Sequence, residues 1–188
     1  MVLKAKIIGG LLIAAVLLCF TYNCDWFQRS FIYPLPYKNS IERYASEYGV
    51  DPCLIAAVIK NESKFSAQAR SNRGAIGLMQ LMPETAMWIA GQQKKDGFQV
   101  SELNDPDSNI KMGVWYIASL QKEFDNNEVL VLAAYNGGRG NVKNWMLQYG
   151  WTMQFADINQ IPYPETRRYA ERVLSSKQRY HQLYAEGK

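Results

Sequence analysis

Residues 51–65 read DPCLIAAVIKNESKF, and this stretch decides the fold. Asp51 is a suitable N-cap and Pro52 suits the first helical position, so a helix is predicted to begin here. Residues 54–59 are all apolar. A helix that is apolar on every face is predicted to lie buried at the centre of a domain. The helix ends in Lys60-Asn61-Glu62-Ser63, which places a carboxyl group at the end of a buried helix.

Outward from this helix, the sequence predicts more helices and no sustained alternation typical of strands. Ser40 is expected to cap a helix that runs to Tyr48 and stops at Gly49. Asp105 and Pro106 open a long amphipathic helix. The other helices are expected at residues 83–90, 128–135, 140–149 and 164–184. The predicted fold class is therefore mainly α, with one domain over residues 40–188.

Length and charge exclude several classes of protein. The 188 residues fit one compact domain with a terminal appendage. Without Lys4 and Lys6 the 21 basic residues fall to 19 against 17 acidic ones, a net charge of +2. Such a balance is too small for a nucleic-acid footprint, so no nucleic-acid partner is expected. We predict a monomer.

Cysteine and histidine usage argues against metal chemistry. The three cysteines, Cys19, Cys24 and Cys53, are an odd number and form no C-x-x-C pair, and His181 is the single histidine. A disulfide framework, a zinc site and a Ser-His-Asp triad are therefore not expected. We predict no metal and no cofactor.

The N-terminus predicts a membrane segment. Lys4 and Lys6 precede Ile7–Phe20, which holds no charged residue. This run is shorter than the roughly 20 residues of a full span, although Val2 and Leu3 can lengthen it. We predict an uncleaved signal anchor over residues 1–24, with the domain extracytoplasmic by the positive-inside rule. A cleaved signal peptide, which would make the protein secreted, is the alternative.

Residues 25–39 are predicted to connect this anchor to the domain. Pro34 and Pro36 favour an extended extracytoplasmic tether. Tyr22, Trp26 and Phe27 are expected to form an aromatic belt at the membrane interface.

The position of Glu62 suggests acid chemistry. A helix C-terminus disfavours negative charge, and apolar neighbours such as Phe65 disfavour it by desolvation. Both effects raise the pKa of a carboxyl group, as a general acid working near neutral pH requires. From position alone, an exposed polar helix end is the favoured interpretation.

Four motifs occur in order along the chain: Glu62-Ser63; Gly77-Leu78-Met79-Gln80 with Met82-Pro83; Ala134-Tyr135-Asn136-Gly137-Gly138; and Glu165-Thr166-Arg167 with Tyr169. Together they resemble the catalytic domain of the soluble lytic transglycosylases, over about residues 41–180. The resemblance implies a lysozyme-like fold of the goose-type lysozyme and transglycosylase kind. An active-site cleft between a helical core and a smaller lobe is part of that fold.

The resemblance also implies the reaction and the roles of residues. Members cleave the β-1,4 bond between N-acetylmuramic acid and N-acetylglucosamine in peptidoglycan glycan strands without water, leaving a 1,6-anhydro ring. Glu62 would be the single catalytic acid and base. The substrate-binding residues implied are Ser71, Gln80, Met82, Tyr135, Asn136 and Tyr169. Packing for Met82, helix capping for Asn136 and a helix-face aromatic for Tyr169 remain structural alternatives. Phe65 departs from the pattern, because many relatives have Trp there.

A second catalytic carboxylate does not stand out. Ordinary glycosidases use two, but Glu84, Asp105 and Asp107 all have structural reasons to lie at helix starts. The substrate's own N-acetyl and 6-hydroxyl groups replace the second acid in a lyase. Two alternatives stay open: a muramidase that uses water on the same fold, and a catalytically silent glycan-binding scaffold in a cell-wall assembly.

Overall fold

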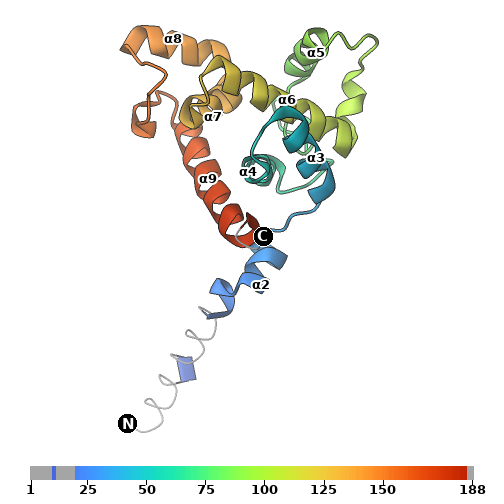
Figure 1. The fold of residues 1–188 in the computed structure, drawn as a ribbon, viewed down its shortest axis with the longest axis vertical. Helices are drawn as coiled ribbons and strands as arrows, with labels where there is room; N and C mark the ends of the chain where they lie inside the picture. Colours follow the sequence, from blue (N-terminus) through green and yellow to red (C-terminus); the bar gives the residue numbers. More distant parts are fainter. Residues whose placement is uncertain (1–9, 12–19, 186–188) are drawn as a thin grey trace.

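The computed structural model describes residues 10–11 and 20–185, and the chain there is almost entirely helical (Figure 1). Within these residues no strand forms, and the extended pairing is limited to two isolated bridges, Arg70 with Ile76 and Ile76 with Leu81. The elements are α2 (Asp25–Phe27), η1 (Gln28–Ile32), α3 (Lys38–Tyr48), α4 (Pro52–Ser63), α5 (Pro83–Gln92), η2 (Val100–Asn104), α6 (Pro106–Glu123), α7 (Glu128–Gly137), α8 (Arg139–Tyr149), η3 (Ile158–Gln160), α9 (Pro164–Tyr180) and η4 (His181–Ala185). The prediction of a mainly α fold is confirmed.

Helix α4 is the centre of the core, as its apolar sequence predicts. Every residue from Cys53 to Ile59 is buried. The Asp51 carboxylate accepts a hydrogen bond from the Cys53 backbone N–H at 2.8 Å, which caps the helix start. Helix α4 packs chiefly against α9 and also against α3, so apolar side chains cover it on several faces. A helix buried in this way fixes its last turn, which carries Glu62, firmly in the domain.

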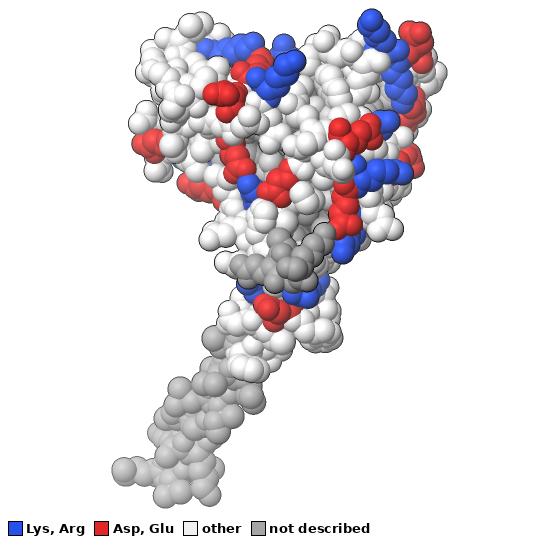
Figure 2. Space-filling model, viewed as in Figure 1, with Lys and Arg blue, Asp and Glu red and all other residues white. Residues whose placement is uncertain are grey.

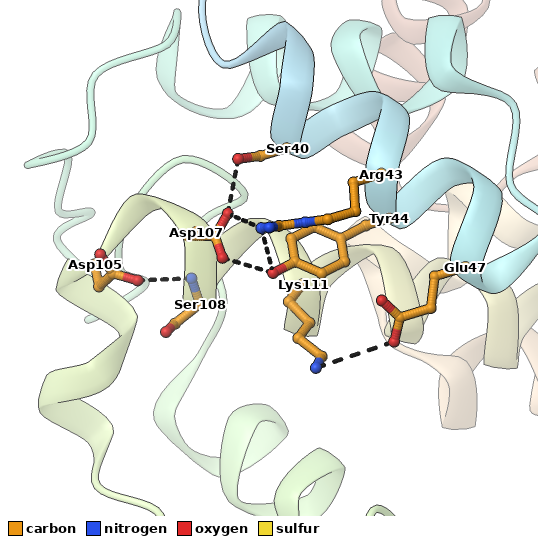
Figure 3. A network of polar contacts seen from close by, with 8 residues as sticks. All are labelled: Ser40, Arg43, Tyr44, Glu47, Asp105, Asp107, Ser108 and Lys111. Carbon is orange, nitrogen blue, oxygen red and sulfur yellow. Dashed lines mark hydrogen bonds and ion pairs between the residues drawn. The ribbon is translucent and has the colours of Figure 1, made fainter.

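Helices α3 and α6 are joined through one carboxylate, that of Asp107 (Figure 3). It accepts hydrogen bonds from the hydroxyls of Ser40 and Tyr44, at 2.7 and 2.6 Å, and from the Arg43 guanidinium at 2.5 Å. Helix α3 begins at Lys38, and Tyr37 before it adopts a left-handed conformation. Ser40 therefore lies inside the helix and is not its cap. The prediction of Ser40 as a cap is wrong because its hydroxyl donates to Asp107 instead.

The segment before the domain is not an extended tether over its whole length. Residues 25–32 form α2 and η1, and these pack at the lower end of α9 (Figure 1). The Arg179 guanidinium contacts the Asp25 carboxylate at 3.1 Å, and the Tyr184 hydroxyl donates to the Tyr33 carbonyl at 2.8 Å. The prediction of an extended segment fails for residues 25–32 because local helical bonds and these contacts to the C-terminal helix replace the extended backbone.

The predicted anchor, residues 1–24, lies outside the described residues except for residues 10–11 and 20–24. Within the described ranges, none of the helices combines the length and the apolar character needed to cross a membrane.

Candidate active site

Glu62 is the penultimate residue of α4, and the backbone ends the helix just after it. Lys64 and Phe65 both adopt left-handed conformations, with φ of 51° and 63°. The Asn61 side-chain amide donates to the Ala57 carbonyl at 2.8 Å and to the Ser176 hydroxyl of α9 at 3.1 Å. The end of α4 is therefore anchored to α9 next to the carboxyl group that it presents.

The loop between α4 and α5 supplies the opposite wall. The Ser71 hydroxyl accepts hydrogen bonds from the backbone N–H groups of Arg73 and Ala75, at 3.3 and 2.9 Å. Gln80 has a left-handed φ of 46°, and its side-chain amide donates to the carbonyls of Ala69 and Gly77 at 3.1 and 2.8 Å. These bonds hold the loop in one shape and fix the Gln80 side chain to it.

A buried asparagine of α6 secures this loop from behind. Asn109 is fully buried, and its side-chain oxygen accepts from the Met79 backbone N–H at 2.8 Å. Its side-chain nitrogen donates to the carbonyls of Ile76 and Leu103, both at 2.9 Å. Gly77 lies so close that a Cβ there would stand 2.2 Å from the Asn109 nitrogen. Gly77 is therefore required for this close approach.

A cavity of about 350 Å³ brings most of the predicted site residues together. Its lining residues are Glu62, Ser71, Asn72, Arg73, Ala75, Gln80, Met82, Tyr135, Asn136 and Glu165. All the predicted site residues except Tyr169 are therefore found around one space, although they are spread over α4, the following loop and α7. Motifs that follow one another along the sequence therefore meet at a single site in the fold.

The Glu62 carboxyl has the electrostatic character of a general acid. Burial is the main cause that raises its pKa, to about 7, and the charge of Glu165 acts in the same direction. The Tyr169 hydroxyl and the charge of Arg172 oppose the rise without cancelling it. The upward shift that the helix-end position predicts is therefore confirmed, and the carboxyl is close to half protonated at neutral pH.

Tyr169 and Tyr135 lie beside this carboxyl. Tyr169 is buried, and its hydroxyl is near enough to affect the pKa of Glu62, although it makes no well-directed hydrogen bond among the described residues. The Tyr135 hydroxyl donates to the Met79 carbonyl at 2.7 Å. Burial and the charge of Glu62 raise the pKa of both phenols well above the ordinary value. Both rings therefore remain neutral and serve to shape and dry the site.

Asn136 and Met82 occupy exposed or half-exposed positions at the cavity. Asn136 lies in the last turn of α7, which ends at Gly137, and its side-chain oxygen accepts from the Thr166 hydroxyl at 2.9 Å. Gly138, not Asn136, is the C-cap. Met82 is half-buried and precedes Pro83 at the start of α5. Helix capping therefore does not explain Asn136, and core packing alone does not explain Met82.

Sequence reasoning missed several residues of the cavity. Asn72, Arg73 and Ala75 come from the loop, and no pattern in the sequence distinguished them. Glu165 belongs to the last of the four motifs, but it is not among the substrate-binding residues that the resemblance implies. The structure places it both in the first turn of α9 and in the cavity lining, with its carboxylate 3.9 Å from the Arg73 guanidinium. Arg172, one turn after Tyr169 on α9, acts on Glu62 through its charge.

The other acids considered as a second catalytic group lie elsewhere. Asp105 caps α6, where its carboxylate accepts from the Ser108 backbone N–H at 2.8 Å, and Asp107 joins α3 to α6 (Figure 3). Glu84 is exposed in the first turn of α5 and lines a different cavity, together with Trp88 and Arg139. None of the three contributes to the Glu62 cavity.

One group of possible metal ligands comes together that the sequence did not predict. The ligand atoms of Asp51, Cys53 and His181 all lie within 4.8 Å of one another. The Asp51 carboxylate is already engaged by the His181 ring at 2.8 Å and by the Lys177 ammonium at 3.3 Å. Because this ammonium competes with a cation, the contacts favour a charge network that holds α9 to the start of α4. None of these residues lines the Glu62 cavity.

Comparisons with known proteins agree with this geometry. Residues 39–158 match the family described as the transglycosylase SLT domain. The soluble lytic murein transglycosylase of Escherichia coli K12 is 34% identical over 145 residues, which cover 76% of this chain and 22% of that protein. The membrane-bound lytic murein transglycosylase C of Yersinia pestis is 32% identical over 165 residues, covering 77% of this chain and 46% of that protein.

A solved structure shows the same fold. The 70 kDa soluble lytic transglycosylase of Escherichia coli superposes with a TM-score of 0.77 at 31% identity, over 87% of this chain and 26% of that one. The chain thus spans between about a fifth and a half of the length of these relatives.

Proposed function

Because the chain belongs to the transglycosylase SLT domain family, with its lysozyme-like fold, we propose that it is a peptidoglycan lytic transglycosylase whose catalytic acid and base is Glu62. The observation that carries this proposal is the Glu62 carboxyl itself. It lies in a cavity with the residues of the other motifs, and its pKa is raised to about 7. A carboxyl group with this pKa can both give and take a proton near neutral pH.

The proposed reaction needs no water and one protein acid. Protonated Glu62 donates its proton to the glycosidic oxygen as the bond from that oxygen to the muramic acid C1 breaks. The substrate's N-acetyl oxygen stabilises the electron-poor C1. The substrate's 6-hydroxyl then attacks C1 and returns its proton to the Glu62 carboxylate. The acid is regenerated, and the products are a free 4-hydroxyl on the N-acetylglucosamine side and a 1,6-anhydro ring on the muramic acid.

The remaining cavity residues are assigned to binding. Gln80, Ser71 and Asn136 present polar groups toward the sugar, and Met82 offers an apolar surface to a ring face. Tyr135 and Tyr169 shield the carboxyl from water, and this burial is what raises its pKa, although the Tyr169 hydroxyl itself acts in the opposite direction. The second carboxylate of the cavity, Glu165, belongs to the largely exposed ion pair with Arg73, whose side chains are 67% and 84% exposed. We assign it to the cleft wall.

Replacing Glu62 with Gln tests this assignment. Glutamine keeps the shape of the side chain but cannot donate the proton, so lysis of purified cell walls should fall by about 10²- to 10⁴-fold. Glu171→Gln is the matched control, because Glu171 is exposed on α9 outside the cavity lining and should keep its activity. Equal lysis by Glu62→Gln and the unaltered chain would remove Glu62 from the mechanism.

Two alternatives remain as outcomes of the same experiments. Glu165 in the cavity lining is the observation that favours a muramidase, in which water replaces the 6-hydroxyl, and the products would then carry reducing ends. A silent scaffold would bind glycan strands without cutting them, and its binding would be unaffected by Glu62→Gln.

We also propose that the N-terminal segment anchors the chain to a membrane as a monomer, with the domain extracytoplasmic. Lys4 and Lys6 precede the apolar run, and a membrane-bound transglycosylase is among the relatives. The described residues at the end of the run and after it expose large aromatic side chains: Phe20 by 76%, Trp26 by 69% and Phe31 by 65%. Exposed aromatics near an apolar segment suit the membrane–water interface.

A further inference from the structure

A second cavity, of about 400 Å³, lies beside the end of α4 and is not part of the site described above. Residues on both sides of Glu62 in the sequence contribute to it, among them Lys60, Lys64 and Phe65. Arg172 of α9 completes this wall. Arg172 also lowers the pKa of Glu62 through its charge, so the cavity lies next to the catalytic carboxyl.

All the charged side chains that line this cavity are positive. Lys60, Lys64 and Arg172 all contribute to its lining, and no acidic side chain of the described part of the chain does so. None of the three forms an ion pair within residues 20–185, whereas many other basic residues there do. Figure 2 shows acidic and basic side chains interspersed over one face of the domain, so a cavity of a single sign is a local feature.

Lys60 is the least exposed of the three. It is half-buried, and its ammonium lies 4.5 Å from the centre of the Tyr33 ring in a cation–π contact, without a negatively charged partner among the described residues. Burial and the charge of Lys64 lower its pKa. A bound anion would relieve this repulsion and supply the missing counter-charge.

Part of the cavity lies outside the range that matches the family. Phe31, Ile32 and Pro34 line it from the N-terminal segment, ahead of residues 39–158 that match the family. Arg172 lies after that range. The helical segment that replaces the expected tether therefore adds apolar walls to a basic recess at the end of the family domain.

We propose that this recess binds the carboxylate groups of an acidic peptide branch carried by the glycan strand in the Glu62 cavity. The proposal rests on the proposed function, which supplies the strand. The cations provide the counter-charge, and Phe31 and Phe65 provide apolar contact for the peptide. A strand bearing such peptides is therefore held more tightly than a bare strand, and the N-terminal segment takes part in substrate choice.

Binding to an inactive background separates this inference from the reaction. In the Glu62→Gln chain, the double variant Lys60→Gln/Lys64→Gln is compared with Lys122→Gln/Arg168→Gln, which removes two exposed charges elsewhere. The probes are soluble glycan strands with their stem peptides and the same strands stripped by an amidase. The first variant should weaken binding of peptide-bearing strands by about three- to tenfold at low salt and leave stripped strands within about twofold. The second should change neither.

Two further measurements make the test more specific. Phe31→Ala alters the recess from the N-terminal segment without changing charge, and Phe31 is largely exposed, so the fold is not at risk. It should reproduce the selective loss. The effect of the lysine variant should shrink in high salt, because exposed charges are screened.

The inference fails if both probes lose affinity equally, or if the lysine variant binds peptide-bearing strands as well as the control. It also fails if the lysine variant instead loses binding to vesicles of anionic phospholipid. The proposed function fails separately, if the unaltered chain binds the strands but cuts neither kind.

Discussion

Replacing Asn109 tests the idea that one buried side chain of α6 holds the substrate loop in shape. Asn109→Ala would remove three hydrogen bonds, those to the Met79 N–H and to the Ile76 and Leu103 carbonyls. The residue is fully buried, so the Met79 N–H and the Leu103 carbonyl would lose the partner that Asn109 supplies, whereas the Ile76 carbonyl would keep its hydrogen bond from the Leu81 N–H at 3.1 Å.

The size of the effect follows from the two groups that lose this partner. An unsatisfied buried polar group costs about 1–3 kcal/mol, so the two together set an upper bound of about 6 kcal/mol. Water can enter the space left by the side chain and bond some of the exposed groups, which removes part of this cost. We expect the free energy of unfolding to fall by about 3–5 kcal/mol.

Urea denaturation followed by tryptophan fluorescence measures this change, since several of the five tryptophans lie in or against the core. Asn144→Ala is the control, because Asn144 is exposed on α8 and should change stability by less than about 0.5 kcal/mol. Asn109→Asp has nearly the same size but turns a donor toward two carbonyls into an acceptor, so it should be as damaging as alanine. A loss below about 1 kcal/mol in Asn109→Ala, with an unchanged denaturant slope, would refute the role assigned to this residue.

The remaining predictions concern the same framework. Gly77→Ala should lower stability by about 2 kcal/mol or more in the same denaturation assay, because the new methyl group would overlap the Asn109 nitrogen and φ is +78°; an unchanged midpoint would refute the clash. Folding raises the pKa of Glu62 from 4.5 to about 7, so the free energy of unfolding falls as the pH rises through that range. The free energy of unfolding of Glu62→Gln should therefore exceed that of the unaltered chain by about 1–3 kcal/mol at pH 8 and equal it at pH 4. The pH profile of kcat/KM should fall on its alkaline side near pH 7 as the acid loses its proton, and a limb near pH 4.5 would contradict the raised pKa. Asp107→Asn should cost about 1 kcal/mol and no activity on cell walls, because it loosens the half-exposed contact between α3 and α6 far from the cavity lining; a loss of activity at full stability would contradict this.

The sequence predicts the helices that local chemistry determines. Asp51 with Pro52, and Asp105 with Pro106, mark helix starts that the structure confirms, because a cap and a fixed φ act within a few residues. The prediction that Ser40 caps a helix was wrong because it relied on the local sequence alone. Its hydroxyl found a partner on α6, 67 residues away, and no local pattern could reveal that bond.

The order of the motifs predicts most of the residues that form the site. The sequence predicts the electrostatics of the site only in part. The upward shift of the Glu62 pKa follows from a buried helix end. The cavity positions of Arg73 and Glu165, by contrast, depend on how the loop after α4 faces the start of α9, and residues so far apart in sequence carry no shared periodicity. The helical form of residues 25–32 likewise depends on contacts with α9 that Pro34 and Pro36 do not foretell.

Digestion of purified peptidoglycan in water enriched in ¹⁸O tests the central claim most directly. If Glu62 directs attack by the substrate's own 6-hydroxyl, the released muropeptides will be one water lighter than hydrolysis products, will contain no ¹⁸O at the muramic acid, and will lack reducing ends. Their formation will stop in Glu62→Gln and continue in Glu171→Gln. Muropeptides that carry one ¹⁸O atom and a reducing end would show that water is the nucleophile and would contradict the account.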